Sequence, residues 1–250
     1  MIALKYFVDF SYCGTSFHGW QKQPNASSVQ ETMEHAFSML LGIPIELIGA
    51  GRTDTGVHAK KMIAHFLTEA HFQKSTLTAR LNAFLPPSIA INTIYKVSDQ
   101  AHARFSASSR TYEYWVSTHK NPFLNTTAHF VHQHLDIVSM NQASQILINH
   151  QDFECFSKTH SDVHTFLCDI SKASWEQKGD LLIFTITANR FLRNMVRAIV
   201  GTLLEIGTHK KNIIDMEAVI ASKSRSLAGP SVPAQGLYLT EINYPKNIYV

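Results

Sequence analysis

The sequence predicts an α+β fold made of two halves of ferredoxin-like type. In the first half the predicted elements follow the order β-α-β-β-α-β, with one further strand. The second half has a similar alternation of helices and strands, although no close sequence repeat is visible. These two observations favour a class in which helices pack on a mostly antiparallel sheet.

A strand and a well-marked helix open the first half. The strand is predicted at 3–10, and the helix follows "SVQE", where Ser28 fits the N-cap and Glu31 completes a capping box. Gly42 closes this helix. The other elements expected here are strands at 45–49, 60–67, 89–97 and 110–118, and a short helix between Ser75 and Pro86.

The second half follows a segment without clear periodicity, "STHKNPFLNTTAHF", which breaks at Pro122. We therefore expect two halves, residues 1–120 and 121–250. The elements predicted in the second half are helices that start near Ser139, at about 191–206 and at 212–222, and strands at 166–176, 181–188 and 237–243.

Composition favours a soluble protein of the cytoplasm. Of 250 residues 45% are apolar, no apolar run reaches the roughly 20 residues that span a bilayer, and the chain starts with a predicted strand instead of a signal segment. The three cysteines form no CxxC pair, which argues against a disulfide framework and against zinc. The net charge of +3 does not by itself indicate nucleic acid, yet residues 190–225 carry seven Lys or Arg against three acidic residues.

The segment "GAGRTDTGVHA", residues 49–59, places Asp54 in a glycine-rich loop. An aspartate between glycines often only caps a turn through its carboxylate. In a functional loop, the glycines would let the backbone approach a ligand closely, and a cation would keep the carboxylate ionised. Arg52 falls on the same side of an extended chain as Asp54, so it fits either a partner of the carboxylate or a contact to the substrate.

A narrow basic stripe runs along the helix predicted at about 191–206. At helical spacing one side carries Arg190, Asn194, Arg197 and Gly201, with Arg193 at its edge. The solvated side of an amphipathic helix is one explanation. Against it, the stripe has no acidic partner before the last turn, and Gly201 would let a neighbour approach the helix closely.

Basic and aromatic residues alternate in the strand predicted at 110–118, which places Arg110, Tyr112 and Tyr114 on one face. Such a face can stack a base and hold phosphates, and a half-buried strand with a tyrosine-rich solvent side is the alternative. His132 and His134 have the spacing of a metal pair but lack a third ligand nearby, so we expect no metal. We also expect no nucleotide cofactor, because the chain has no GxSxG, GxGxxG or GxxxxGK[ST] motif.

Segments spread over nearly the whole chain resemble the tRNA pseudouridine synthase A family. They are "YCGTSFHGWQKQP", "SVQETME", "GAGRTDTGVHA", "HARFSASSRTYEY", "NPF", "FLRNMVRAIVGTLL" and "PAQGLYL". The resemblance implies two ferredoxin-like halves that share a mixed, mostly antiparallel central sheet, with helices on one face and an RNA-binding cleft on the other. It also implies a homodimer without metal or cofactor, which converts uridine to pseudouridine in the anticodon stem-loop of tRNA at positions 38, 39 and 40.

The resemblance assigns roles to individual residues. Asp54 matches the essential catalytic aspartate, and Arg52 matches the arginine associated with displacing the target base. Tyr112 matches the tyrosine that stacks on the target uridine, and Arg197 matches the basic residue that pairs with the aspartate.

A uracil pocket and RNA contacts complete the expected site. Leu237 or Leu239 matches the apolar wall of the pocket. The basic residues expected to contact RNA are Arg190, Arg193 and Arg110. The chain departs from the family at Cys13, where aspartate is common, and at Cys168 and Asp169, near a position where many members have arginine. These departures leave the catalytic aspartate untouched.

The residues by themselves leave other functions open. Basic and aromatic features would equally serve a noncatalytic RNA-binding module or an RNA chaperone. A hydrolytic glycosidase normally needs two carboxylates, and the loop offers one. An isomerase that breaks a C–N bond and forms a C–C bond within one nucleoside needs no redox cofactor, and one carboxylate can act in it as nucleophile or base.

Overall fold

The computed structural model describes residues 3–159 and 163–250, and the chain divides into two compact units. The first unit comprises Met1–Ser108 and Tyr238–Val250, and the second comprises Ser109–Leu237. This division differs from the expected one at residues 120 and 121. The reason is that the strand beginning at Ser109 pairs along its length with a strand of the second unit.

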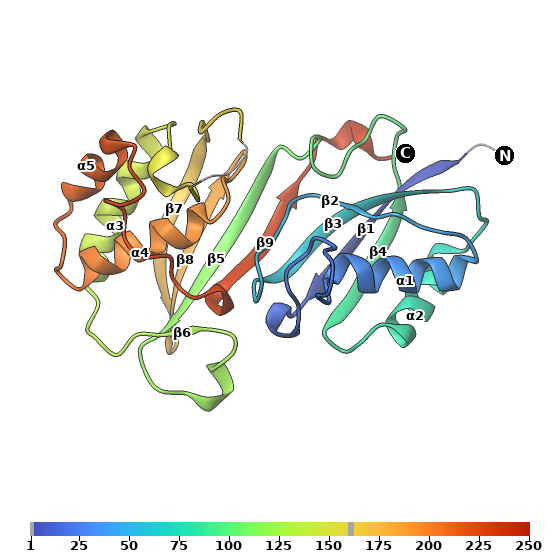
Figure 1. Cartoon of the computed structure of the whole chain (residues 1–250), viewed down its shortest axis with the longest axis horizontal. Coiled ribbons are helices and arrows are strands. Elements are labelled where there is room, and N and C mark those ends of the chain that lie inside the picture. The colour runs from blue at the N-terminus through green and yellow to red at the C-terminus, as the bar shows by residue number, and fades with distance from the viewer. Residues whose placement is uncertain (1–2, 160–162) are drawn as a thin grey trace. The chain divides into compact units, whose positions relative to one another are not determined.

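The first unit has the strand order β4-β1-β3-β9, with the short β2 also on β3 (Figure 1). Its elements are β1 (Leu4–Tyr12), α1 (Val29–Leu41), β2 (Ile48–Gly49), β3 (His58–Thr68), α2 (Lys74–Phe84), β4 (Ile89–Lys96) and most of β9 (Leu237–Asn243). β1 is antiparallel to β3 and β4, whereas β9 is parallel to β3. Apart from β9, this is the β-α-β-β-α-β arrangement expected from the sequence, with its second strand reduced to two residues.

Helix α1 packs on the face of this sheet that carries Phe66. The ring of Phe37 in α1 meets the ring of Phe66 edge-on, with 5.0 Å between their centroids. The helix begins where the Ser28 hydroxyl accepts a hydrogen bond from the Glu31 backbone N–H, and it ends at Gly42 in the left-handed conformation. Both helix caps predicted from the sequence are therefore confirmed.

The second unit has the strand order β5-β8-β7, with β6 beside β5. Its elements are β5 (Ser109–Ser117), β6 (His129–Phe130), α3 (Ile137–Ile146), β7 (Ile170–Lys178), β8 (Leu181–Ala188), α4 (Met195–Gly207) and α5 (Asp215–Ser222). β8 is antiparallel to both of its neighbours, and helix α3 lies against α4, α5 and β7 (Figure 1). Mostly antiparallel strands with five α-helices in the described residues confirm the predicted α+β class.

Helix α3 starts at Ile137, two residues before Ser139. The carboxylate of Asp136 accepts hydrogen bonds from the backbone N–H and the hydroxyl of Ser139, at 3.0 and 2.7 Å. Asp136 is therefore the N-cap, and Ser139 lies inside the first turn of a helix that starts at Ile137, near the predicted start.

Helix α4 starts later than predicted. Asn194 adopts a left-handed conformation with φ of 67°, and Met195 is the first helical residue. The prediction of a helix from about 191 is therefore wrong in its first turn. Arg190 and Arg193 precede the helix, and only Arg197 among the arginines of the predicted stripe lies on α4.

Two kinds of feature are absent from residues 3–159 and 163–250. No helix there is both long enough and apolar enough to cross a membrane. No group of three or more His, Cys, Asp or Glu side chains there could hold a metal ion.

Candidate active site

The loop that carries Asp54 joins β2 to β3 and is fixed by the segment that follows β1. The backbone N–H of Trp20 donates to the carbonyl of Thr53 at 3.3 Å. The hydroxyl groups of Tyr12 and Thr53 share a hydrogen bond of 2.8 Å. On the other side of the aspartate, the N–H of Gly56 donates to the carbonyl of Phe17 at 3.3 Å. The backbone is thus tied down immediately before and shortly after Asp54.

Asp54 itself closes the turn through its backbone. Its carbonyl accepts a hydrogen bond from the N–H of Val57 at 3.2 Å, and Gly56 between them has a positive φ of 79°. The Asp54 side chain is half-buried, and the Arg52 side chain is exposed. A carboxylate in such a fixed, partly exposed place can reach a ligand without reorganising the loop.

Two glycines outside the loop allow the segment after β1 to approach the Asp54 loop closely. A Cβ on Gly14 would lie 2.0 Å from the carbonyl oxygen of Val57. A Cβ on Gly19 would lie 2.3 Å from the carbonyl oxygen of Thr53, and Gly19 also has a positive φ of 88°. Both glycines are needed so that the segment after β1 can lie directly on the Asp54 loop.

The glycines inside the loop differ from one another. Gly49 faces the indole of Trp20, since a Cβ there would lie 2.6 Å from the ring. Gly51 has no neighbour within 4 Å of an added Cβ. We expected these glycines to let a ligand approach the backbone. At Gly49 this space is filled by the indole of Trp20, so the expectation does not account for that glycine, and it stays a prediction for Gly51.

His58 anchors the end of the loop and was not singled out from the sequence. Its Nδ1 accepts a hydrogen bond from the Gly14 backbone N–H at 3.1 Å, which leaves the ring proton of the neutral form on Nε2. The buried imidazole stacks on the ring of Tyr238, with centroids 4.6 Å apart and an interplanar angle of 18°. The "VHA" that ends the loop motif is the only sequence signal that could have identified it.

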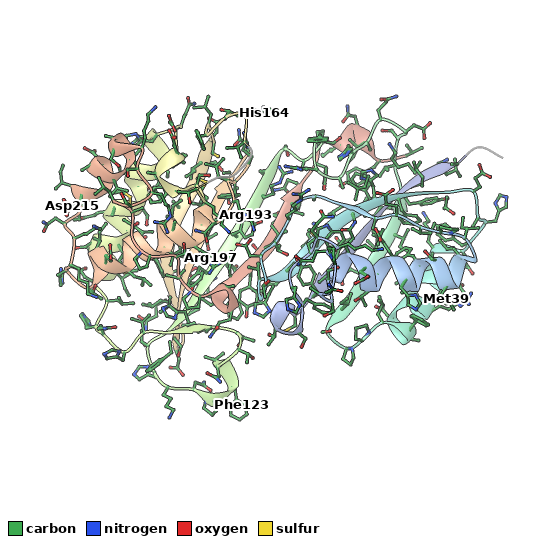
Figure 2. The ribbon with its side chains drawn as sticks, viewed as in Figure 1. Met39, Phe123, His164, Arg193, Arg197 and Asp215 are labelled. Atoms are coloured by element: carbon green, nitrogen blue, oxygen red, sulfur yellow. The ribbon has the colours of Figure 1, made fainter. Side chains whose placement is uncertain are left out.

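In the second unit, Arg197 lies on α4 (Figure 2). The segment that precedes β9 holds its side chain. Its Nε donates to the carbonyl of Val232 at 2.7 Å, and the Val232 N–H donates to the Arg197 carbonyl at 3.3 Å. The hydroxyl of the fully buried Tyr114 donates to the next carbonyl, that of Pro233, at 2.8 Å. Burial raises the pKa of Tyr114 far above its usual value, although the charge of Arg197 acts in the opposite direction.

Gly201, one turn after Arg197, is in contact with the chain itself. A Cβ at Gly201 would lie 1.7 Å from the carbonyl oxygen of Pro230. The N–H of Gly229 donates to the hydroxyl of Thr202 at 2.8 Å. The close neighbour expected at Gly201 is therefore the 229–230 segment, which Arg225 also holds through a hydrogen bond of 3.0 Å to the Gly229 carbonyl.

The predicted basic and aromatic strand face is partly buried. Tyr112 is half-buried and meets Phe191 edge-on at 5.1 Å and 87°, while Tyr114 further along the face is inaccessible. A guanidinium nitrogen of Arg110 donates to the carbonyl of Asn189 at 2.8 Å. Arg110 and Tyr112 thus both contact the 189–191 turn that leads to α4.

The other expected site residues of this unit occupy different environments. Arg193 is exposed, and its carbonyl accepts a hydrogen bond from the Lys158 N–H at 3.0 Å. Arg190 is half-buried and donates to the carbonyl of Thr165 at 3.3 Å. Leu237 is buried at the start of β9.

The departures from the family pattern have structural surroundings of their own. The Asp169 carboxylate accepts a hydrogen bond of 2.7 Å from the side chain of Asn189, so this aspartate stabilises the turn that Arg110 contacts. Burial raises the pKa of Cys168 to about 11, which makes it a poor nucleophile. Cys13 is exposed, and its thiol lies 3.3 Å from the hydroxyl of Thr15.

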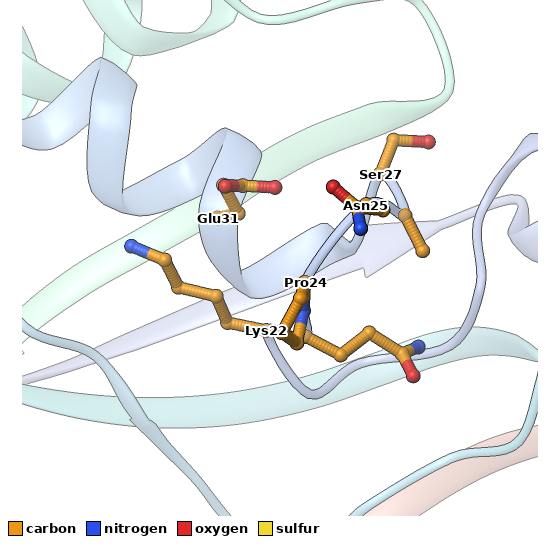
Figure 3. A pocket seen from close by; sticks show the side chains of 7 residues that line it. Lys22, Pro24, Asn25, Ser27 and Glu31 are labelled. Atoms are coloured by element: carbon orange, nitrogen blue, oxygen red, sulfur yellow. The ribbon is translucent and has the colours of Figure 1, made fainter.

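An open depression lies at the start of α1, apart from the expected site residues (Figure 3). It is lined by Lys22, Gln23, Pro24, Asn25, Ala26, Ser27 and Glu31. Gln23 and Ala26 pair across the turn that forms its wall, and Asn25 at the tip has a positive φ of 58°. Asp54 does not line this depression.

Comparison with known proteins identifies the family. A family model described as tRNA pseudouridine synthase matches residues 10–106 and 143–245. A protein of Parabacteroides distasonis named tRNA pseudouridine synthase A is 47% identical over 246 residues, which cover 98% of this chain and 98% of that protein. Proteins with the same name from Bacteroides thetaiotaomicron and Bordetella petrii are 47% and 40% identical, over 98% and 95% of this chain and 92% and 90% of their own lengths.

Both blocks of the family match include the residues around which the site is built, Asp54 in the first and Arg197 in the second. The chain belongs to the tRNA pseudouridine synthase family. It is an enzyme, and its reaction class is that of an isomerase.

Proposed function

We propose that this isomerase converts uridine to pseudouridine in the anticodon stem-loop of tRNA, at positions 38, 39 and 40, with Asp54 as its catalytic carboxylate. The observation that carries the proposal is the position of Asp54 in a loop whose backbone is tied down on both sides, at Thr53 and at Gly56. The name shared by the relatives, tRNA pseudouridine synthase A, supports tRNA as the substrate.

The reaction moves one bond within a nucleoside. The glycosidic C–N bond breaks, the base turns, and a C–C bond forms between the same base and ribose. The proton on the newly bonded carbon leaves, and the released ring nitrogen ends with a proton, so atoms and electrons balance without an oxidant or reductant. Asp54 can act as the nucleophile that holds the sugar or base between these steps, or as the base that removes the proton.

The base must leave the RNA stack before Asp54 can reach it. We assign Arg52 to displacing the target base, since this exposed side chain precedes the aspartate by two residues. Tyr112 and Leu237 would provide the aromatic and apolar walls for the flipped uracil, and Arg197 would keep the Asp54 carboxylate ionised. The hydrogen bond from Nε of Arg197 to Val232 fixes the plane of its guanidinium for such a role.

The remaining parts of the proposal concern partners and setting. Arg110, Arg190 and Arg193 would contact the RNA backbone, because arginine binds phosphate through paired donors. We propose that the enzyme works in the cytoplasm as a homodimer and needs neither a metal nor an organic cofactor. The family match favours this isomerase over the noncatalytic RNA-binding module or RNA chaperone that the sequence alone left open.

Tritium release from tRNA that carries 5-tritiated uridine tests the proposal. We expect the wild type to release tritium and Asp54→Asn to lose turnover by several orders of magnitude while it still binds tRNA, because the amide keeps the shape but cannot act as nucleophile or base. Asp180→Asn, which makes the same change at an exposed turn, serves as the control and should behave as the wild type.

Two results would show that the proposal is wrong. One is a wild-type protein that releases no tritium, and the other is full turnover by Asp54→Asn. Free uracil among the products would indicate instead a hydrolytic glycosidase.

A further inference from the structure

A phenylalanine outside the proposed active site is presented to solvent. Phe105 lies on the segment between β4 and β5, within the first unit, and its side chain is 76% exposed. A single exposed apolar residue is common on a protein surface. Phe105 differs because a row of rings lies behind it and the guanidinium of Arg104 lies over its ring.

The row of rings extends from Phe105 into the core. The rings of Phe105 and His102 are 4.4 Å apart at an angle of 36°. His102 in turn meets His65 of β3 edge-on at 4.5 Å, and His65 lies 6.2 Å from the buried Phe7 of β1. Only 5% of His65 is exposed, so the row connects an exposed ring to the interior of the sheet.

Backbone hydrogen bonds fix the turn that carries Phe105. Nδ1 of His102 accepts from the N–H groups of Arg104 and Phe105, at 3.1 and 3.3 Å. Nδ1 of His65 accepts from the N–H of Ala103 at 3.2 Å. Burial lowers the pKa of both histidines, that of His65 to about 4, so both rings stay neutral and keep these acceptors at neutral pH.

Two basic residues, Arg104 and Lys5, contact or lie near the members of this row of rings. The guanidinium carbon of Arg104 lies 5.6 Å from the centre of the Phe105 ring. Lys5 is close enough to lower the pKa of both histidines, and its ammonium donates to the backbone carbonyl of Asp99. Asp99 is the one acidic residue in the segment 98–108. An aromatic ring with a guanidinium over it, on a turn that hydrogen bonds fix, matches the chemistry of an unstacked base with its phosphate.

We propose that Phe105 and Arg104 form a second contact for the RNA substrate, in which Phe105 stacks on an unpaired base and Arg104 binds a neighbouring phosphate. This inference rests on the proposed function, because it requires an RNA substrate. The base is a different nucleotide from the target. The row of rings reaches β3 at His65, and the Asp54 loop is anchored at His58 of the same strand. These two residues are seven positions apart, which corresponds to roughly 23 Å along a strand.

Binding of an unmodified tRNA transcript tests this contact. We expect Phe105→Ala to weaken binding by on the order of tenfold, because stacking of a base on an aromatic ring is lost. Phe105→Trp should bind within about twofold of the wild type, since a larger aromatic face can still stack, whereas Phe105→Leu should behave as Phe105→Ala. At saturating tRNA the single-turnover rate of tritium release should stay within about twofold for all three variants, since the contact lies far from the target.

Phe84→Ala provides the matched control, because Phe84 is another exposed phenylalanine of the same unit, on α2, with 47% of its side chain exposed. It should bind tRNA as the wild type does. Wild-type affinity in Phe105→Ala, or equal affinity in Phe105→Leu and Phe105→Trp, would overturn the proposed contact. If the contact is wrong but the proposed function is right, the wild-type enzyme still releases tritium. If the proposed function is wrong but the contact is right, no tritium is released, yet tRNA binding still depends on an aromatic residue at 105.

Discussion

At Gly19 the chain has no room for a side chain, and the atom in the way belongs to the loop that carries Asp54, the proposed catalytic aspartate. We expect Gly19→Ala to destabilise the fold by about 1–3 kcal/mol, because the added Cβ would meet the Thr53 carbonyl at 2.3 Å in a backbone conformation that disfavours alanine. Turnover should fall by on the order of tenfold or more as the loop shifts. Urea unfolding and single-turnover tritium release measure the two effects.

Gly51→Ala is the control for that substitution, since an added Cβ at Gly51 meets nothing within 4 Å. Its unfolding free energy should change by less than about 0.5 kcal/mol. If Gly19→Ala were as stable as Gly51→Ala and as active as the wild type, the close contact between the segment after β1 and the loop would have no role in holding Asp54.

His65 makes the stability of the first unit depend on pH. Its pKa is lowered from 6.5 to about 4, so the unfolded chain binds more protons than the folded chain between these values. Stability from the neutral ring is therefore fully present above about pH 6.5 and is lost as the pH falls toward 4. Between pH 7 and pH 5 the wild type should lose about 1–2 kcal/mol more than His65→Gln, as measured by urea unfolding at each pH.

The comparison with His65→Gln is needed because other groups also titrate in acid. His102 and Lys5 face His65, and the pKa of His102 is lowered as well. His134→Gln, at an exposed position, should keep the wild-type pH dependence. Equal pH dependence in His65→Gln and the wild type would contradict a neutral, buried His65.

Residue by residue, the sequence predicted what is local and missed what is distant. Glycines and polar residues placed Asp54 in a loop, and the first helix was correctly delimited because its caps lie within the helix's own sequence. The contacts that hold the loop, from Tyr12, Trp20 and His58, join residues up to 44 positions apart in sequence. Local composition contains no information about such pairs.

Helix α4 provides a test at the scale of an element. Alanine is a better helix former than glycine by up to about 1 kcal/mol, so propensity alone predicts that Gly201→Ala stabilises α4. We expect the opposite, a loss of about 1–3 kcal/mol, because the Cβ would lie 1.7 Å from the Pro230 carbonyl oxygen and the backbone there must move. Urea unfolding measures the sign directly.

Ser75→Ala in α2 is the matched control for a small residue changed to alanine in a helix. Ser75 is exposed, so the change should be neutral or slightly stabilising. Stabilisation by Gly201→Ala to the same degree would mean that the 229–230 segment does not rest on the helix.

One physical cause explains why periodicity did not locate the starts of α3 and α4 to the residue. Apolar spacing continues through 191–194, yet Asn194 takes a left-handed conformation and its side chain donates to the Ser231 hydroxyl at 2.6 Å. At α3 the apolar pattern likewise does not predict that Asp136, just before the helix, is the N-cap. Periodicity reports which residues share a face, and it does not report the tertiary or capping contact that ends a helix.

On the scale of the whole molecule, the proposed site residues are divided between the two units. Asp54 and Arg52 belong to the first unit, and Arg110, Tyr112 and Arg197 belong to the second. The family match is divided as well, into residues 10–106 and 143–245. Sequence motifs identify the candidate residues, because each motif lies within one short segment. They do not predict how Arg197 is oriented, because this depends on a hydrogen bond to Val232, 35 residues further along the chain.

The charge of the molecule as a whole gives the last prediction, which concerns the salt dependence of tRNA binding. Each arginine that neutralises a phosphate releases counterions. Its removal therefore makes the negative slope of log affinity against log salt less steep by about 1. Arg193 is exposed just before α4, and we expect Arg193→Ala to show this full effect in binding measured from 50 to 200 mM salt. Arg190→Ala should have a smaller effect on the slope, because Arg190 is half-buried and already donates to the Thr165 carbonyl.

Arg80→Ala is the control, because it removes the same charge from an exposed position on α2 and should leave the slope unchanged. Equal slopes for Arg193→Ala and Arg80→Ala would mean that Arg193 does not contact the RNA.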